Sequence, residues 1–599
     1  MPLQAQGTSG AVVTGRVQNA VSGNYLTNAR VRVAGTKLET FTDSSGEYRL
    51  TGVPAGQATL DVFYTGMAAQ KVLVSVPASG SVSQDVALRG VGATTKEGDT
   101  LVMGQFVVES QRETDAAAIA INEQRFAPNR KDVVATDAFG DINQGNIGEF
   151  VKFIPGISLD VKDGNSPSGI MIRGFDPNYT NVTMDGGALA STQIANTQTS
   201  SRGFLLEQAS INNLARIEVT KLPTPEMSAN VLGGSVNFVS KSAFEHSRES
   251  LTFNAFLSAN SNTITFDQTP GPGADSTYKI RPNFDLTYIK PISKTLGFVA
   301  TLQQSSQSYL QNKSVPTRRY TSGGATLTNP QTTAMASSYN PNQIDRTSGS
   351  IKVDWKPFDH QVLSFTADAS ANRQQNASRT LTYNVGGGTP VAWDEHNTFG
   401  SVGATGTGTA NEGNSYQNRN GLLRHVAGSW NYTGNDWLFE LAGSYSNSNN
   451  RVRDTAKGFW NGLSTSLPNV KTVNIEGIDN SSASFGKATV LDATGKPIDE
   501  LKAASYNLGK VTSQPADNQD TMKEVRGSVT RNLTLLGNTF AVKAGGSIND
   551  MIRDQHYSLV ETTYVGPDGI ANSGDETAAP FADAKDPNHT PGFGRPGPQ

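Results

Sequence analysis

Few residues in this chain could carry out catalysis. The sequence contains no cysteine, and none of its six histidines precedes His246. Thiolate nucleophiles and cysteine metal sites are therefore excluded. The H-E-x-x-H, G-x-S-x-G and Walker A motifs are missing, and the G-x-G-x-x-G match at 592–597 contains a proline and opens no helix. We expect no catalytic residue, no metal site and no cofactor.

Charged residues near glycines between residues 146 and 239 form a second group of interest. The group comprises Arg173, Gly174, Asp185, Gly186, Glu218, Gly233 and Gly234. Glycine permits the positive φ angles and the close backbone approach that tight reversals between short strands require. The neighbouring charges could simply be solvated. The arrangement of these residues by itself indicates tight turns and does not indicate a catalytic site.

One helix and several short strands are expected to position these residues. Apolar residues at 147, 150, 151 and 154 share a helical face, while Asn146 and Glu149 have the spacing of a capping box. Pro155-Gly156 ends this helix. Short strands are predicted at 156–160, 170–174 and 181–187. This region is therefore predicted to be a compact α/β unit.

Composition favours a mainly β protein. The 599 residues include 60 glycines, only 17% are charged, and the net charge is −4. This charge gives no electrostatic footprint for nucleic acid. No apolar stretch of about 18 residues is present, so a transmembrane helix is not expected. The opening Leu3-Gln4-Ala5 could be the end of a cleaved signal peptide, and we expect a signal sequence to be missing.

The first ninety residues predict a small β-sandwich. Apolar-patterned runs at 12–17, 29–33, 47–50 and 58–62 are separated by Gly, Asn and Asp turns. The segments at 42–48 and 52–56, with their T-D-x-x-G-x-Y and G-V-P-A-G turns, resemble the carboxypeptidase regulatory-like domain. The resemblance implies a non-catalytic structural appendage, with glycan binding as the alternative.

The sequence after Lys241 predicts membrane-spanning strands. Runs of about ten residues carry apolar groups at every second position, as in Leu363, Phe365, Ala367 and Ala369. Connections at 290–294, 356–360, 433–436 and 535–538 are short, whereas those at 306–345, 372–420 and 447–521 are long and polar. Short turns at one end and long loops at the other are typical of outer-membrane barrels. About nine strands can be counted, so an incomplete antiparallel barrel and a fragment of a longer chain are expected.

Five ordered motifs resemble the plug of TonB-dependent outer-membrane receptors. They are Phe153-Ile154-Pro155-Gly156-Ile157, Ile172-Arg173-Gly174-Phe175, Met184-Asp185-Gly186, Ala215-Arg216-Ile217-Glu218-Val219-Thr220-Lys221 and Leu232-Gly233-Gly234-Ser235-Val236-Asn237-Phe238-Val239. The resemblance implies an energy-coupled transporter in the outer membrane of a Gram-negative-type bacterium. It also implies that charges matching Arg173 and Glu218 face the barrel wall and hold the plug.

The resemblance implies partners as well. A β-prone run at 100–109 occupies the place of a TonB box, which pairs with a periplasmic TonB-type energy transducer; an ordinary connector strand is the alternative. The candidate contact residues are Leu101, Val102, Met103, Phe106, Val107 and Val108. The polar segment 188–206 matches plug loops that meet ligand, or is a flexible loop. Its candidate substrate contacts are Thr192, Gln193, Asn196, Gln198 and Arg202.

The predicted organisation has four parts: a sandwich at 10–90, a linker with the candidate TonB box at 91–121, a plug at 122–245, and the N-terminal part of a barrel at 248–599. The expected partners are the transducer, outer-membrane lipid and a small-molecule or oligosaccharide substrate, with no nucleic acid. The segment 221–227 resembles receptors linked to plant or algal polymer scavenging, which favours a carbohydrate over a siderophore. The alternative function is a secreted or surface glycan-binding adhesin without transport.

Overall fold

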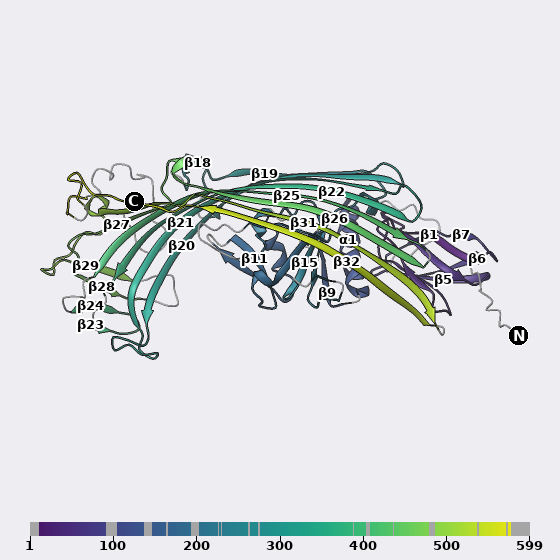
Figure 1. The fold of residues 1–599 in the computed structure, drawn as a ribbon, viewed down its shortest axis with the longest axis horizontal. Coiled ribbons are helices and arrows are strands. Elements are labelled where there is room, and N and C mark those ends of the chain that lie inside the picture. The colour runs from purple at the N-terminus through teal and green to yellow at the C-terminus, as the bar shows by residue number, and fades with distance from the viewer. Residues whose placement is uncertain are drawn as a thin grey trace.

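The computed structural model describes residues 11–90, 105–127, 129–136, 146–162, 166–192, 203–225, 227–228, 231–261, 264–272, 276–386, 389–402, 408–434, 436–478, 486–535, 538–570 and 573–576. Figure 1 shows a small sandwich at one end, a mixed domain in the middle, and a long curved sheet that extends over both. The predicted mainly β fold is confirmed.

Two four-stranded sheets form the N-terminal sandwich. The first contains β1 (Ala11–Asn19), β4 (Glu47–Val53), β7 (Ser81–Ser83) and β8 (Val86–Leu88); the second contains β2 (Arg30–Val33), β3 (Glu39–Phe41), β5 (Gly56–Phe63) and β6 (Gln70–Val76). Alternate residues of β1 are buried, so one face of this strand packs into the core. The core contains Val13, Val31, Leu60 and Tyr64, all fully buried.

A five-stranded mixed sheet forms the middle domain, in the order β13-β12-β15-β14-β9. Its strands are β9 (Lys131–Ala135), β12 (Thr180–Met184), β13 (Gly187–Ala188), β14 (Leu214–Thr220) and β15 (Gly234–Ser240). A separate hairpin of β10 (Ile157–Lys162) and β11 (Ser166–Ile172) lies next to it. Ile172, Ile217 and Phe238 are fully buried in the shared core. The predicted α/β unit is therefore present.

The helix predicted at 146–154 is shorter in the structure. Helix α2 spans only Gly148–Val151, and its N-cap residue Ile147 makes no side-chain capping bond. Asn146 instead accepts a bond from the Gly148 N–H at 2.8 Å, and Glu149 pairs with Lys152. The predicted capping box is wrong because Glu149 turns to a neighbouring cation. The apolar spacing nevertheless identified the buried face, since Ile147, Phe150 and Val151 are all fully buried.

The strand predicted at 100–109 is also wrong for residues 105–109, which begin helix α1 (Gln105–Phe126). The segment 112–124 is rich in Ala, Glu and Gln, which favour helix, and the helix extends back through the two valines. Leu101, Val102 and Met103 lie outside the described residues. Among the described residues, no helix has both the length and the apolar character needed to cross a membrane.

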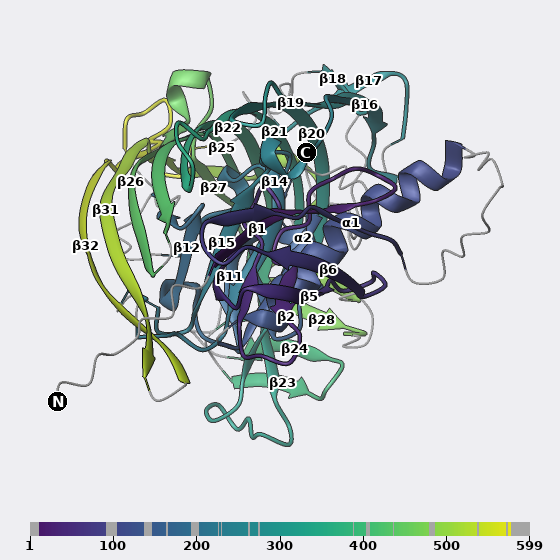
Figure 2. The same cartoon turned by 90° about the vertical axis from the view of Figure 1, so that its right-hand side faces the viewer.

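Nine long antiparallel strands form the path of the large sheet, as the sequence predicts. They are β16 (Ser250–Ser258), β19 (Arg281–Pro291), β20 (Leu296–Arg319), β21 (Gln331–Trp355), β22 (Gln361–Asn384), β25 (Thr409–Thr433), β26 (Trp437–Arg453), β31 (Ala516–Leu535) and β32 (Asn538–Tyr557). The four predicted short turns separate consecutive strands of this set. Figure 2 shows the sheet as an arc, with the middle domain on its concave side.

The long connections are more ordered than the sequence predicts. Strands β20, β21, β22 and β25 each have 24 or 25 residues, so they continue well into the segments 306–345 and 372–420. From the sequence, each strand is predicted to end where the alternation of apolar residues stops. The strands continue past that point because a strand can be mainly polar on both faces. A small sheet lies at this end, built from β23 (Thr389–Trp393), β24 (Thr398–Val402), β28 (Thr472–Glu476) and β29 (Lys487–Leu491). Tyr383, Val473, Ile475 and Tyr506 form its fully buried core.

Five further short strands belong to the described structure. β27 (Gly462–Ser466), β30 (Asn507–Ser513) and β33 (Val560–Thr563) extend the large sheet, while β17 (Gln268–Pro270) and β18 (Ser276–Tyr278) form a separate hairpin. These elements lie away from the middle domain, whose contacts with the large sheet form the candidate site described next.

Candidate functional site: the seam between the middle domain and the large sheet

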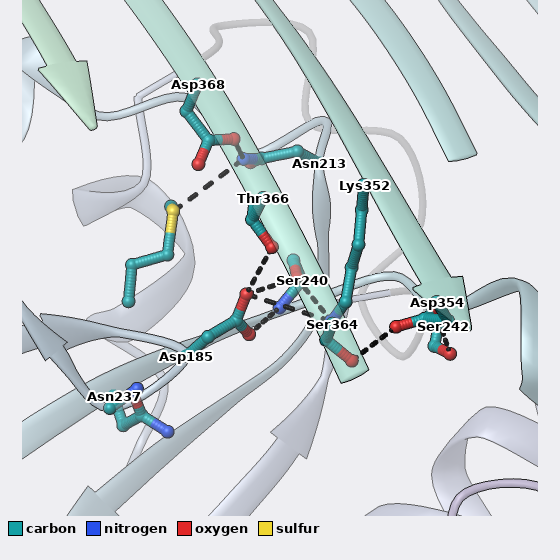
Figure 3. Close-up of polar contacts among 12 residues, drawn as sticks. Asp185, Asn213, Asn237, Ser240, Ser242, Lys352, Asp354, Ser364, Thr366 and Asp368 are labelled. Carbon is teal, nitrogen blue, oxygen red and sulfur yellow. Dashed lines mark hydrogen bonds and ion pairs between the residues drawn. The ribbon is translucent and has the colours of Figure 1, made fainter. Parts of the chain in front are cut away.

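Asp185 is the central residue of the seam, which is the line of polar contacts between the middle domain and the large sheet (Figure 3). It lies in the turn after β12 with φ +48°, followed by Gly186 with φ +74°. Ser240 donates to its carboxylate from the hydroxyl at 2.6 Å and from the backbone N–H at 3.0 Å. From the large sheet, Thr366 donates at 3.2 Å and Lys352 lies 3.7 Å away.

The electrostatics of Asp185 explain why a partly buried carboxylate is stable here. Burial alone would raise its pKa, but the ammonium of Lys352 and the hydrogen bonds from Ser240 outweigh burial and hold the pKa below its ordinary value. Lys352 also donates to the Ser240 hydroxyl at 2.8 Å. The carboxylate, the hydroxyl and the ammonium therefore form one hydrogen-bonded unit that joins β15 to β21.

Strand β31 binds the backbone of the same turn. Arg526 donates to the carbonyls of Gly186 and Asp185, the latter at 3.1 Å, and Glu524 accepts from the Ala188 N–H at 2.9 Å. A Cβ atom on Gly186 would lie only 2.4 Å from the Arg526 guanidinium. Glycine is needed at 186 both for the positive φ and for this close approach.

Strand β26 continues the seam. Ser446 accepts from the Ala190 N–H at 2.9 Å, and Ser448 accepts from the Thr192 N–H at 3.1 Å. Thr192 is 1% exposed, and its hydroxyl bonds to Ser448. The large sheet occupies its polar atoms in this structure, and its role as a substrate contact stays a prediction. Gln193, Asn196, Gln198 and Arg202 lie outside the described residues.

Two carboxylates of β21 and β22 bind the middle domain from the other direction. Asp354 accepts from Ser242 at 2.7 Å, and Asp368 accepts from Asn213 at 2.6 Å. The buried His425 lies 3.3 Å from Asp368. A cavity of about 250 Å³ adjoins the seam, and its lining includes Asp185, Glu218, Lys352, Glu524 and Arg526. Most bonds across the seam are single and polar, so water can replace them one at a time.

Within the described part of the chain, no hydrogen bond or ion pair joins Arg173 or Glu218 directly to the large sheet. Arg173 is exposed with φ +55°, in the turn after β11. Glu218 pairs with Lys131 at 2.9 Å and accepts from Asn237 at 3.1 Å, both within the middle domain. Glu218 nevertheless lines the cavity next to Lys352 and Arg526 of the large sheet. The expectation that these charges face the wall and hold the plug stays a prediction.

Glycines 174, 233 and 234 serve local geometry. Gly174 has φ +79° in the turn after β11, and Gly234 has φ +138° at the start of β15. A Cβ atom on Gly234 would lie 2.8 Å from Ile172 and 2.9 Å from the Thr220 carbonyl. Gly233 donates its N–H to the Tyr179 carbonyl at 2.9 Å. Their predicted role in tight turns and close approach therefore agrees with the structure.

A buried charge cluster joins helix α1 to the middle domain. Arg216 lies 2.6 Å from Glu123 of α1 and 3.1 Å from Glu245, and Lys131 contacts Glu218. Three carboxylates thus share two cations. Burial raises the pKa of Glu123 to about 7, despite the opposing charges of Arg216 and Lys131. One proton on this cluster would balance its charge near neutral pH.

Sequence reasoning missed the partners supplied by the large sheet, Lys352, Glu524 and Arg526. Their signal was nevertheless present in the sequence. Lys352 lies between Ile351 and Val353, while Glu524 and Arg526 flank Val525. A charged residue at a polar position of an alternating strand indicates a contact on the inner face, but it does not name the partner.

Two family models match the chain. Residues 12–89 match the carboxypeptidase regulatory-like domain, and residues 123–235 match the TonB-dependent Receptor Plug Domain. Residues 123–235 therefore match the plug domain of TonB-dependent receptors. We refer to the middle domain as the plug and to the large sheet as the wall. The family is one of receptors and transporters, not of enzymes.

Individual relatives are distant. Transferrin-binding protein A of Neisseria meningitidis is 28% identical over 104 residues, which cover 16% of this chain and 11% of that protein. Among solved structures, a mutant ferric enterobactin receptor of Pseudomonas aeruginosa is 11% identical with a TM-score of 0.29, covering 68% of this chain and 63% of the other. The siderophore receptor PiuA of Acinetobacter baumannii is 11% identical with a TM-score of 0.26, covering 71% and 62%. The chain spans less than two thirds of each of these proteins.

Replacing Arg526 with Ala should loosen the plug. The change removes both guanidinium bonds to the turn at 185–186, and bonds to charged groups contribute roughly 1.5–3 kcal/mol each. We expect the full-length receptor in planar bilayers to show plug-opening conductance at lower urea concentrations than the wild type. Lys523→Ala, on the opposite face of the same strand, is the matched control and should behave as wild type. Identical urea thresholds for Arg526→Ala and wild type would contradict this role.

Proposed function

We propose that this receptor takes up a scarce nutrient across the outer membrane of a Gram-negative-type bacterium, with energy from a TonB-type periplasmic transducer. The observation that carries the proposal is a plug domain joined to the inner face of a strand wall through exchangeable polar bonds. A blockage held in this way can shift without global unfolding. A secreted adhesin has no need of such a plug, so the glycan-binding adhesin is the weaker alternative.

The outer face of the wall supports a position in lipid. Apolar side chains on the face away from the plug are largely exposed, among them Phe253, Leu257, Ile351, Phe365, Leu441, Val525 and Ile548. They lie on six strands: β16, which carries both Phe253 and Leu257, and β21, β22, β26, β31 and β32. A continuous apolar surface of this size is unfavourable in water, and it matches the lipid-facing band of outer-membrane proteins.

Charge should distinguish the two faces of β32. Ile548 is 78% exposed and pairs with Val525 on the outer face, whereas Asn549 pairs with Glu524 on the plug side. We expect Ile548→Lys to reduce assembly in the full-length receptor, since a charge near the bilayer centre costs roughly 2–4 kcal/mol. Asn549→Lys should assemble normally. Heat-modifiable gel mobility of outer-membrane fractions measures assembly, and equal assembly of the two variants would contradict the lipid-facing assignment.

The proposed TonB box remains the segment 100–109. Helix α1 begins at Gln105, so pairing with a transducer strand requires its first turn to unwind. Helix ends fray at little cost, and an added strand would gain backbone hydrogen bonds in exchange. The helical start of the segment is therefore compatible with strand addition, and the linker at 91–121 is proposed to connect the transducer to the plug.

A proline at Val107 tests this segment. Val107 is the third residue of α1, where the N–H has no acceptor within the helix and proline is tolerated. Proline cannot donate to an added strand. We expect Val107→Pro to abolish uptake while outer-membrane insertion stays normal, and Val107→Ala, the control, to retain uptake. Radiolabelled nutrient accumulation measures both, and normal uptake by Val107→Pro would remove the TonB-box assignment.

The inner face of the wall, beyond the seam, favours a neutral substrate rich in hydroxyl groups. Five amide side chains that are at most 6% exposed form the amide wall: Asn340, Asn342, Asn372, Gln374 and Asn450. Among the described residues, none of their side-chain oxygens accepts a hydrogen bond. An unpaired buried amide costs roughly 1–3 kcal/mol, which a ligand hydroxyl could recover.

Amides both donate and accept but carry no charge, so they suit sugars better than ferric chelates. The segment 221–227 independently favours a carbohydrate. We therefore propose an oligosaccharide as the substrate and keep a siderophore as the alternative. The N-terminal sandwich is not needed for this recognition, since the amide wall belongs to β21, β22 and β26.

Ligand retention tests the substrate class. We expect native mass spectrometry of full-length receptor, purified from cells grown on plant polysaccharide, to detect hexose or pentose oligomers. Asn342→Ala should reduce retention about tenfold, because the loss of roughly 1.4 kcal/mol changes affinity by that factor. Gln375→Ala, on the outward face of β22, is the control. A retained ferric chelate, visible by its absorption, would replace the carbohydrate with a siderophore.

A further inference from the structure

The N-terminal sandwich is attached to the barrel wall through Lys356. This residue begins the short turn between β21 and β22, and its side chain is only 9% exposed. Its ammonium lies 3.0 Å from Glu47 and 3.6 Å from Asp43, and it donates to the Ser45 hydroxyl. It also lies 5.5 Å from the ring centre of Phe244, just after the plug sheet. One cation therefore joins the sandwich, the plug and the wall.

The sandwich turn that receives Lys356 is preorganised. Asp43 accepts from the backbone N–H groups of Ser45 and Glu47, at 2.8 and 3.0 Å. Arg16 binds the other oxygen of Glu47, at 2.9 Å from Nε. Burial would raise the pKa of Glu47, but Lys356 and Arg16 together hold it below its ordinary value, so the carboxylate is charged at neutral pH. Little conformational entropy is lost when this turn docks.

A second contact reinforces the first. Arg49 of β4 lies 3.0 Å from the imidazole of His360, at the far end of the same short turn. The attachment thus spans the whole connection between β21 and β22. Two anchored ends oppose rotation of the sandwich about Lys356.

Helix α1 is clamped between the sandwich and the plug. On the sandwich side, Asn122 accepts from the Thr65 N–H at 3.0 Å, and Phe126 contacts Phe41 with ring centres 4.9 Å apart. Ala118 belongs to the sandwich core. On the plug side, Ala120 packs with Val133, and Glu123 pairs with Arg216. The helix cannot leave the plug in isolation while the sandwich holds its other face.

Chain connectivity gives this clamp a mechanical consequence. Residues 91–104 connect Gly90 of the sandwich with Gln105 of α1, so tension applied within them loads both ends. One branch reaches the barrel wall through Lys356, and the other reaches the plug through α1. The contacts through Lys356 and the contacts through α1 share the applied force until one set of contacts breaks.

We propose that the N-terminal sandwich is a mechanical latch, which holds α1 and the plug at rest until a pull on residues 91–104 detaches the sandwich from the turn at 356–360. The latch rests on the proposed energy coupling only for the origin of the pull. It gives the sandwich a role beyond that of an appendage. Ion pairs and single hydrogen bonds suit this task, since they resist a small load and re-form in water.

Single-molecule pulling tests the latch without a substrate or a transducer. A peptide handle inserted after Lys96 is pulled while the full-length receptor is held in a nanodisc. We expect an early rupture event before any plug extension. Lys356→Met should roughly halve the force of this event, because it removes every charged contact of the turn with Asp43 and Glu47. Lys294→Met, in the exposed neighbouring turn, should leave the force unchanged.

A reversible cross-link provides a second test of the latch. The chain lacks cysteine, so Arg49→Cys with His360→Cys can be joined selectively by a short, reducible bis-maleimide. The early rupture should disappear in the cross-linked receptor and return after reduction. A Gln57→Cys with Ser75→Cys pair, joined within the sandwich across β5 and β6, should leave the rupture in place.

An early rupture that survives the 49–360 cross-link, or equal forces for Lys356→Met and wild type, would overturn the latch. Either result would leave the proposed uptake function intact, since that function is tested separately by Val107→Pro. Conversely, a latch confirmed by pulling together with normal uptake by Val107→Pro would reject the TonB-box assignment alone.

Discussion

A β-strand has only two faces, and this constraint determines what the wall of the receptor can contact. On β22, Phe365 is half exposed on the outer face, while the adjacent Thr366 is buried against Asp185 of the plug. On β31, Val525 lies outside and Arg526 lies inside. A shift of one residue in register would exchange the faces and destroy both surfaces at once. The seam, the apolar band and the amide wall all depend on this alternation.

Buried charges connect the parts of the molecule to one another. Lys356 joins the sandwich to the wall, the Glu123 cluster joins α1 to the plug, and Asp185 with Lys352 joins the plug to the wall. An unpaired buried charge is strongly unfavourable, so each junction specifies one partner. The same bonds can be exchanged for water when the parts separate. This combination of specificity and reversibility supports the proposed function, in which the plug stays closed at rest and moves under load.

The end of the wall away from the sandwich shows a different use of the same strands. β20 to β22 and β25 continue without a break into segments that are mainly polar on both faces, apart from apolar residues such as Met335 and Leu381 that pack against the small sheet. There the small sheet of β23, β24, β28 and β29 acquires a core of its own around Tyr383 and Ile475. Near the plug the outer face of the wall is apolar, whereas farther out both faces are mainly polar. This change supports the proposal that the wall passes from lipid into water.

Sequence alone determined the periodic features. Alternation located nine strands and their short turns, the glycine-flanked motifs identified the plug, and the early turns identified the sandwich, because these features depend on neighbours along the chain. It failed where the partner lies far away. Residues 105–109 were predicted as strand but begin a helix, and Arg526, Lys352 and Lys356 were overlooked. Only the tertiary structure decides such cases, since the energy of a buried polar group depends on which distant group satisfies it.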